Sequence, residues 1–170
     1  MFTFLKELFQ LAKMLFKNKP SDMDKVELLE MKSFPFKGYK YMMWCGKVIY
    51  RSDKKDRIES ELGTDLFKIS MNHETIHLCQ AQYKGTWFKY YISYLWEWVK
   101  GNPIVKPYSS AYYTIPYEME AYGNEDDFSY ILNYNGKNLK KFYTIKDRKK
   151  SYKEQGGTSY KWKEYCKNIL

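Results

Sequence analysis

Two histidines stand four residues apart in the stretch MNHETIHLCQ, and the chain contains no others. On a helix, residues i and i+4 lie on one face, so His73 and His77 could point two imidazoles at one metal ion. Glu74 directly follows the first histidine and would lie beside the ion rather than on it. A carboxylate there could take a proton from a zinc-bound water, whose pKa zinc lowers to about 7. The spacing therefore indicates a hydrolytic zinc site.

A catalytic zinc needs three protein ligands, and with no further histidine the third must be Asp, Glu or Cys. Cys79 points to the opposite side of the helix from His77. The segment PYEMEAYGNE offers Glu118 and Glu120, but about 200° of helix rotation separates them, so only one can face the metal. Glu118 lies on the apolar face, where a buried carboxylate needs a cation, and this favours it. Asn124 follows Glu120 by four residues and could orient a histidine ligand, which keeps Glu120 open.

The motifs HETIHLCQ and, about 40 residues later, YEMEAYGNE resemble those of the glutamate-liganded zincins, the gluzincins. They look closest to short bacterial zincin-like proteins with H-E-x-x-H-x-x-Q and then E-x-E-A. The resemblance covers about residues 36–130 and implies a zinc-dependent metallopeptidase. His73, His77 and Glu118 would then be zinc ligands and Glu74 the general base. Gln80 matches the family's glutamine and would support the site from beside its ligands.

The resemblance also implies an α+β fold, a compact zincin-like domain in which a small antiparallel sheet or hairpin accompanies the HExxH helix. Many gluzincins have Asp or Asn four residues after the liganding glutamate, whereas this chain has Tyr122. A peptidase also needs a donor for the developing oxyanion, and with no third histidine a tyrosine is expected. Tyr122 and Tyr113 are the candidates, and Tyr112 and Tyr117 also lie near in the sequence.

Local patterns predict the elements that must position these residues. The β-favouring residues on both sides of Cys45-Gly46 predict two strands within 36–51. Thr64 or Asp65 can cap the zinc helix and Gly85 can end it. A helix over 2–17 is expected to pack on the domain, and a helix from Thr86 to Gly101 is expected in the core because it is aromatic all round. Further helices are expected from Pro116, within 126–135 and at the C-terminus. The segment 103–115 is expected to be a loop.

The length of 170 residues predicts a single domain over 1–170. We divide it into an N-terminal helix and linker (1–35), a core that carries the motifs (36–135) and a basic C-terminal extension (136–170). Three cysteines without a CxxC pair predict reduced thiols and no disulfide framework. We find neither a secretory signal nor an apolar run long enough to span a membrane, so a cytoplasmic or membrane-peripheral location is expected.

The net charge of +9 permits an acidic partner. The expected partner is a peptide or protein substrate, with Zn²⁺ as the cofactor. The alternative is a catalytically silent zincin-like protein that binds metal, or a basic module that contacts an anionic membrane surface or nucleic acid. Lysines and aromatic residues alternate over 137–153, but such a run is usually a solvated face, so no specific nucleic-acid binding is expected. The amphipathic stripe at 2–17 leaves weak peripheral membrane association open.

Overall fold

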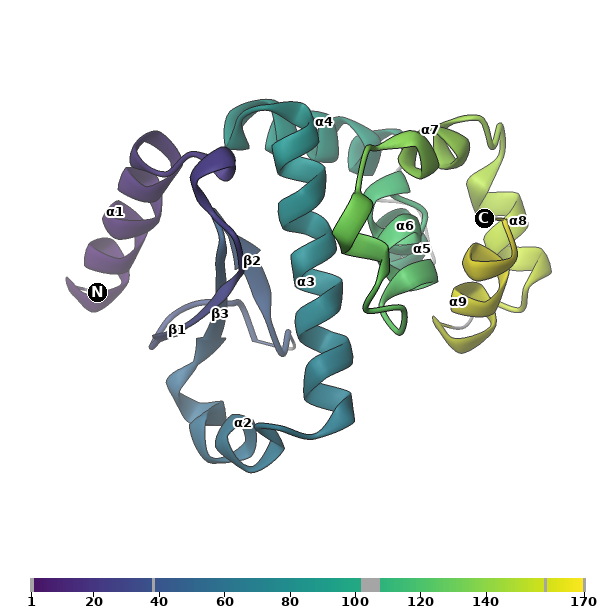
Figure 1. The fold of residues 1–170 in the computed structure, drawn as a ribbon. Coiled ribbons are helices and arrows are strands. Elements are labelled where there is room, and N and C mark those ends of the chain that lie inside the picture. The colour runs from purple at the N-terminus through teal and green to yellow at the C-terminus, as the bar shows by residue number, and fades with distance from the viewer. Residues whose placement is uncertain (1, 38, 102–107, 158, 170) are drawn as a thin grey trace. The chain divides into compact units, whose positions relative to one another are not determined.

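The computed structural model describes residues 2–37, 39–101, 108–157 and 159–169 (Figure 1). The protein is α+β and mostly helical, with a three-stranded sheet, so the predicted fold class is confirmed at this level. The chain forms two compact units, Met1–Phe88 and Lys89–Leu170. The boundary between them falls inside helix α4 (Trp87–Lys100). The single domain expected over 1–170 stays a prediction.

The sheet of the first unit combines β1 (Glu27–Met31), β2 (Met42–Trp44) and β3 (Lys47–Arg51) in the order β1-β3-β2. The predicted hairpin is present, because β2 and β3 pair antiparallel around Cys45 (φ 49°) and Gly46 (φ 81°). Two positive φ angles are what a type I′ turn requires.

The expected small antiparallel sheet or hairpin is present as the β2–β3 pair, but β1 pairs parallel to β3, so the three-stranded sheet is mixed. Strand β1 reads ELLEM, and glutamate, leucine and methionine are good helix formers. Its strand conformation therefore comes from pairing with β3 and not from local propensity.

Helix α1 (Phe2–Lys17) packs on this sheet, as expected for the N-terminal segment. The core there consists of Leu11, Met31, Phe34 and Ile49. The Trp44 indole N–H donates to the Leu11 carbonyl at 2.8 Å and so ties the helix to β2. The short 3-10 helix η1 (Pro20–Asp22) then leads the chain towards β1.

Helix α3 (Asp65–Lys84) carries the HExxH motif and follows the short helices η2 (Ser52–Lys54) and α2 (Lys55–Glu61). Its predicted limits are confirmed. The Thr64 hydroxyl accepts the Phe67 amide N–H at 3.2 Å, and Gly85 ends the helix in the left-handed conformation. The Gln82 amide donates to the Met23 carbonyl at 2.8 Å and anchors α3 near η1.

The second unit is helical in its described part. It consists of most of α4, then α5 (Tyr108–Tyr113), α6 (Pro116–Asn124), η3 (Tyr130–Asn133), α7 (Lys137–Tyr143), α8 (Arg148–Glu154) and α9 (Ser159–Asn168). Pro116 opens α6 as predicted, and α9 confirms the C-terminal helix. The loop expected over 103–115 is partly wrong because α5 occupies its end, and residues 102–107 lie outside the described part. The helix expected within 126–135 is the single 3-10 turn η3.

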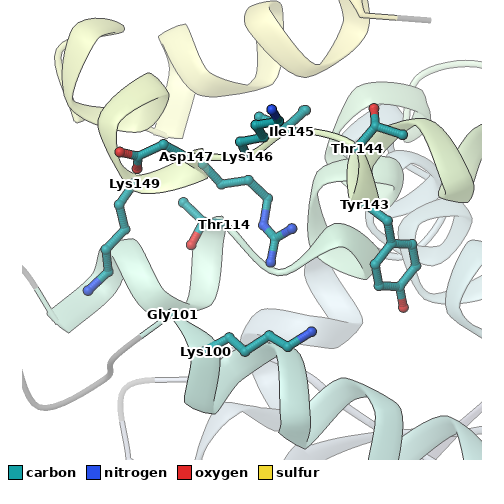
Figure 2. Close-up of a pocket in the computed structure, with 10 residues that line it drawn as sticks. Lys100, Gly101, Thr114, Tyr143, Thr144, Ile145, Lys146, Asp147 and Lys149 are labelled. Atoms are coloured by element: carbon teal, nitrogen blue, oxygen red, sulfur yellow. The ribbon is translucent and has the colours of Figure 1, made fainter.

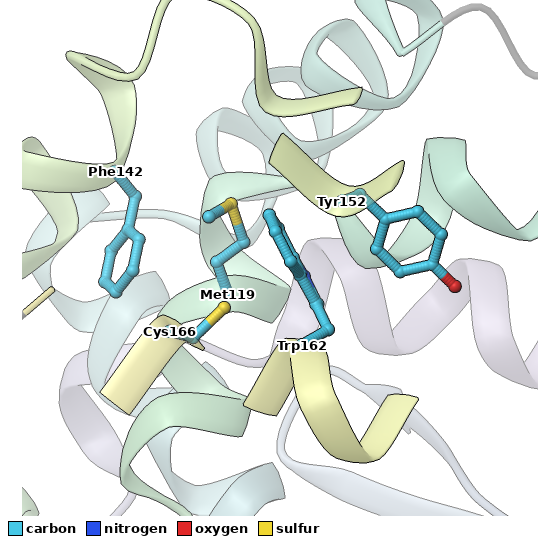
Figure 3. Packing of buried hydrophobic residues seen from close by; sticks show 5 residues of the cluster. All are labelled: Met119, Phe142, Tyr152, Trp162 and Cys166. Carbon is cyan, nitrogen blue, oxygen red and sulfur yellow. The ribbon is translucent and has the colours of Figure 1, made fainter. Parts of the chain in front are cut away.

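The core of the second unit joins α6 to the three C-terminal helices. Figure 3 shows its five buried members, Met119, Phe142, Tyr152, Trp162 and Cys166. The Trp162 indole N–H also donates to the Tyr113 carbonyl at 2.7 Å. The basic segment 136–170 thus contributes much of this core, and Phe142 and Tyr152 are buried where no base could stack on them.

Helix α4 differs most from expectation. We predicted that it lies in the core because it is aromatic all round, but only one side of it is buried, through Trp87, Tyr90 and Glu97. A stripe of large apolar side chains on its other side is exposed to solvent. Within the described residues, no helix combines the length and the apolar character needed to cross a bilayer.

Candidate metal centre

The two histidines lie on the buried side of α3. Both His73 and His77 are buried, and their neighbours Ile76 and Leu78 belong to the apolar core. The helix is held at both ends by its caps, so the two rings keep the i, i+4 relationship that the sequence predicted. Their ring planes are nearly perpendicular (84°), with centroids 4.8 Å apart.

The ring nitrogens are arranged as metal ligands need to be. The Nε2 atoms of His73 and His77 lie 3.2 Å apart. A tetrahedral zinc with Zn–N bonds of about 2.0–2.1 Å places two nitrogen ligands about 3.3 Å apart. The spacing of the two atoms therefore already fits one shared ion.

Gln80 sets the protonation pattern of His77. Its side-chain oxygen lies 2.8 Å from His77 Nδ1, and both side chains are buried. An amide oxygen can only accept, so Nδ1 carries the proton and the lone pair remains on Nε2. This is how a neighbouring acceptor orients a histidine ligand and makes it more basic. The supporting role that the gluzincin resemblance implies for Gln80 stays a prediction.

Glu118 is buried on α6 among tyrosines. The Tyr94 hydroxyl, from α4, donates to Glu118 Oε1 at 2.6 Å. Tyr112 also shares a hydrogen bond with this carboxylate. Burial, and secondly the charge of Glu118, raises the pKa of Tyr94 and of Tyr112 well above its usual value. Both phenols are therefore protonated near neutral pH and serve as donors to Glu118.

His73, His77 and Glu118 form a group of three buried side chains that could hold a metal ion. Each offers one ligand atom, and these atoms lie within 4.8 Å of one another. Glu120 has a different environment, because its two carboxylate oxygens accept the hydroxyls of Tyr130 and Tyr134 at 2.7 and 2.8 Å. These contacts favour Glu118 over Glu120 as a ligand.

Asn124, considered as a residue that could orient a histidine, lies on α6 and is buried. Its side-chain amide donates to the backbone carbonyl of Glu120 at 2.7 Å, one turn back on α6. Cys79, Cys45 and Cys166 are buried and form no disulfide, which agrees with the prediction that there is no disulfide framework.

Glu74 is half-buried on α3, next to the first histidine. The charge of Glu74 affects the pKa of Tyr41, which lies in the segment before β2. Burial first, and then Glu61 and Glu74, raise the pKa of Tyr41 to about 12. The Tyr41 hydroxyl is buried and has no hydrogen-bond partner among the described protein atoms. Sequence reasoning did not single out Tyr41, because nothing local relates it to a helix more than 20 residues away.

The tyrosines considered as oxyanion donors have different environments. Tyr122 is hydrogen-bonded with Tyr112, and burial, followed by the charge of Glu118, raises its pKa. Tyr113 stacks on Tyr152 with ring centroids 5.9 Å apart. Tyr113 therefore belongs to the core of the second unit, whereas Tyr122 belongs to the electrostatic environment of Glu118. The residue that sequence reasoning missed here is Tyr94, which precedes Glu118 by 24 residues and lies within a run of other aromatic residues.

A basic pocket of about 340 Å³ lies elsewhere in the second unit (Figure 2). Lys100, Lys146, Arg148 and Lys149 line it together with Asp147. The buried carboxylate of Glu97 binds Lys100 Nζ and Arg148 Nη2, each at 2.6 Å. Lys100 and Arg148 are thus held by Glu97, and the pocket contains none of the predicted site residues.

We compared the chain with protein-family models, curated proteins and solved structures, and none of them matches it. The functional interpretation therefore depends on the residues and geometry described above. The zincin-like fold and the gluzincin resemblance stay predictions.

Proposed function

We propose that the protein is a zinc-dependent metallopeptidase of the gluzincin type. The observation that carries the proposal is the pair of histidine Nε2 atoms 3.2 Å apart, with Gln80 on the Nδ1 of His77. A histidine pair on a solvated helix surface would need neither burial nor this acceptor. The group of His73, His77 and Glu118 supports the proposal further, because two imidazoles and one carboxylate are a ligand set of catalytic zinc sites.

The three side chains fit zinc by their chemistry. Imidazole nitrogen and carboxylate oxygen suit a borderline ion, and the absence of a fourth protein ligand in this group leaves a position for water. Zinc bound there would act as a Lewis acid and lower the pKa of water to about 7. Tyr94 and Tyr112 hold the Glu118 carboxylate in one orientation, as Gln80 holds His77.

Glu74 has the role of general base. It accepts a proton from the attacking water while the water oxygen forms a bond to the peptide carbonyl carbon. It then delivers that proton to the amide nitrogen as the C–N bond breaks, which yields a carboxylic acid and an amine. Tyr41 and Tyr122 both stay protonated near neutral pH, so either could donate a hydrogen bond to the oxygen that becomes negative.

The test separates metal binding from catalysis. We expect the purified protein to bind one zinc per chain and to cleave members of a broad peptide library in a chelator-sensitive way. Glu74→Gln should retain zinc and lose at least 100-fold in cleavage rate, while His77→Ala should lose both. Zinc binding without any cleavage would reduce the proposal to a metal-binding protein, and no zinc in the wild type would end it.

A paired comparison identifies the third ligand. Glu118→Gln should lower zinc affinity by 100-fold or more, because it removes a charged ligand. Glu120→Gln should leave the affinity within a few fold, since Tyr130 and Tyr134 engage that side chain. The reverse order of effects would assign the ligand to Glu120.

A further inference from the structure

Helix α1 exposes an apolar face that the fold leaves uncovered. Leu11 points into the core, whereas Phe2, Leu5, Phe9 and Phe16 are between 54% and 85% exposed. At 100° per residue these four side chains lie within one third of the helix circumference, on the side opposite Leu11. Large aromatic and aliphatic side chains are not needed on a solvated face, so this stripe indicates a contact surface.

Lysines border this stripe, and the only acidic residue of α1, Glu7, does not lie on the same face. Lys6, Lys13 and Lys17 follow one another along the edge of the apolar face and are exposed. The Lys13 ammonium lies 4.6 Å from the centre of the Phe9 ring. Glu7 points the other way, into the fold, where its carboxylate accepts the backbone N–H groups of Lys32 and Ser33. The surface that α1 presents is therefore apolar and cationic.

Helix α4 repeats this arrangement. Phe88, Ile92, Leu95, Trp96 and Val99 follow the spacing i, i+4, i+7, i+8, i+11 and are between 49% and 62% exposed. Lys89 and Lys100 lie at the edge of the stripe, and the Lys100 ammonium is 5.6 Å from the Trp96 ring centre. The single acidic residue of α4, Glu97, is buried between Lys100 and Arg148.

We propose that the protein docks on anionic membrane surfaces through the exposed apolar faces of α1 and α4. An interfacial helix needs an apolar face that enters the acyl boundary and cations at its edge that reach the headgroups. Helix α1 has the face and three exposed lysines, and α4 has the face with the exposed Lys89 at its edge. Phenylalanine and tryptophan with flanking lysines suit that boundary. A second copy of the chain fits these faces less well. Its own α1 and α4 would place the same lysines opposite these lysines and would offer no exposed carboxylate to pair with them.

Charge complementarity indicates that the membrane surface bound by these helices is anionic. The chain carries a net charge of +9, and each lysine near an anionic bilayer contributes about 1 kcal/mol of binding, a factor of roughly five. Uncharged lipid offers the apolar phase without this contribution. We therefore expect binding to vesicles that contain phosphatidylglycerol and little binding to pure phosphatidylcholine.

The experiment is flotation of the full chain with vesicles of phosphatidylcholine alone or with one quarter phosphatidylglycerol. The apolar variants are Leu5→Ser/Phe9→Ser/Phe16→Ser in α1 and Ile92→Ser/Trp96→Ser/Val99→Ser in α4. The matched control is Leu132→Ser/Tyr160→Ser, which changes two side chains that are 75% and 74% exposed outside both helices. Circular dichroism and thermal unfolding of every variant verify that it is folded.

Wild-type protein and the control should float with the anionic vesicles, and each apolar variant should lose at least tenfold in apparent affinity. Lys6→Gln/Lys13→Gln/Lys17→Gln should lose on the order of 100-fold. Glu74→Gln should float like the wild type, which makes this outcome independent of the proposed peptidase function. Equal binding to uncharged vesicles, no binding at low salt, or equal losses in the control would overturn the proposal. So would loss of a dimer in the apolar variants without any vesicle binding by the wild type.

Discussion

At the scale of single residues, the hydrogen-bond acceptors and donors that touch His77 and Glu118 would determine how these side chains bind a metal ion. Gln80 keeps the proton of His77 on Nδ1 and leaves Nε2 available, and Tyr94 directs one oxygen of Glu118. Neither residue would touch the ion. Their effect is on the orientation and basicity of the side chains that would.

The role of Gln80 predicts the effect of two substitutions. Gln80→Ala should weaken zinc binding by about 10- to 100-fold, because His77 loses the acceptor that fixes its tautomer. Gln80→Glu keeps an acceptor at the same place and should restore most of the affinity. Competition with a chromogenic chelator measures both. Equal losses in the two variants would mean that Gln80 acts only through packing.

Tyr94→Phe removes one hydroxyl and retains the ring. We expect zinc affinity to fall by about tenfold, because Glu118 loses its 2.6 Å donor. The free energy of unfolding should fall by about 1–2 kcal/mol, since the buried carboxylate is then less well solvated. Tyr83→Phe, at an exposed position of α3, is the control for both measurements. An unchanged zinc affinity in Tyr94→Phe would exclude the positioning role.

At the scale of elements, buried or half-buried carboxylates join helices to their neighbours. Glu7 links α1 to the end of β1, where its oxygens accept the N–H groups of Lys32 and Ser33 at 2.7 and 2.9 Å. Glu97 links α4 to α8 through Arg148. These contacts explain why two helices with exposed apolar faces are nevertheless held in place.

The Glu7 contact should make stability depend on pH. Burial raises the pKa of Glu7, but the hydrogen bonds from Lys32 and Ser33 outweigh it and lower the pKa overall. A carboxyl whose pKa is lowered on folding stabilises the fold above its unfolded pKa, and this stabilisation is lost as the pH falls through the folded pKa. Urea unfolding at pH 7 should show a loss of about 1–2 kcal/mol in Glu7→Gln. The difference from wild type should shrink in acid, and a difference that grows there would contradict the assignment.

Glu97→Ala should be among the more destabilising single changes in the second unit. It leaves the mostly buried Arg148 guanidinium without its carboxylate, which costs about 3 kcal/mol. Glu154→Ala is the matched control, because it removes an exposed carboxylate 3.9 Å from Lys150 and should cost less than about 0.5 kcal/mol. Urea unfolding of the two variants measures the loss in the free energy of unfolding. Equal losses would show that the buried ion pair contributes no more to stability than a surface ion pair.

At the scale of the whole molecule, zinc should act as a folding ligand. A metal that binds only the folded chain stabilises it by about 2.7 kcal/mol at 100 times its Kd. We expect a chelator to lower the melting temperature and zinc to restore it, with no such difference in His77→Ala. The zinc-dependent increase should shrink as the pH falls, because protonated imidazoles cannot bind metal. A chelator-insensitive melting temperature at pH 7.5 would contradict metal binding by the folded chain.

The sequence by itself determined the local features of this protein. The HExxH spacing, the Thr64 and Gly85 caps of α3, the start of α6 at Pro116 and the Cys45-Gly46 turn depend on residues within a few positions of one another. Helix periodicity and backbone preferences act over that range, so these patterns could be read without a structure.

Tertiary structure decided which distant side chains meet and which faces stay exposed. It brought the Tyr94 hydroxyl into a hydrogen bond with Glu118, and the hydroxyls of Tyr130 and Tyr134 into hydrogen bonds with Glu120. It also gave the segment ELLEM its strand conformation. It also left one side of the aromatic helix α4 exposed, where its composition predicted burial. Burial, strand pairing and hydrogen bonding between residues far apart depend on the packing of whole elements, and no local pattern contains that information.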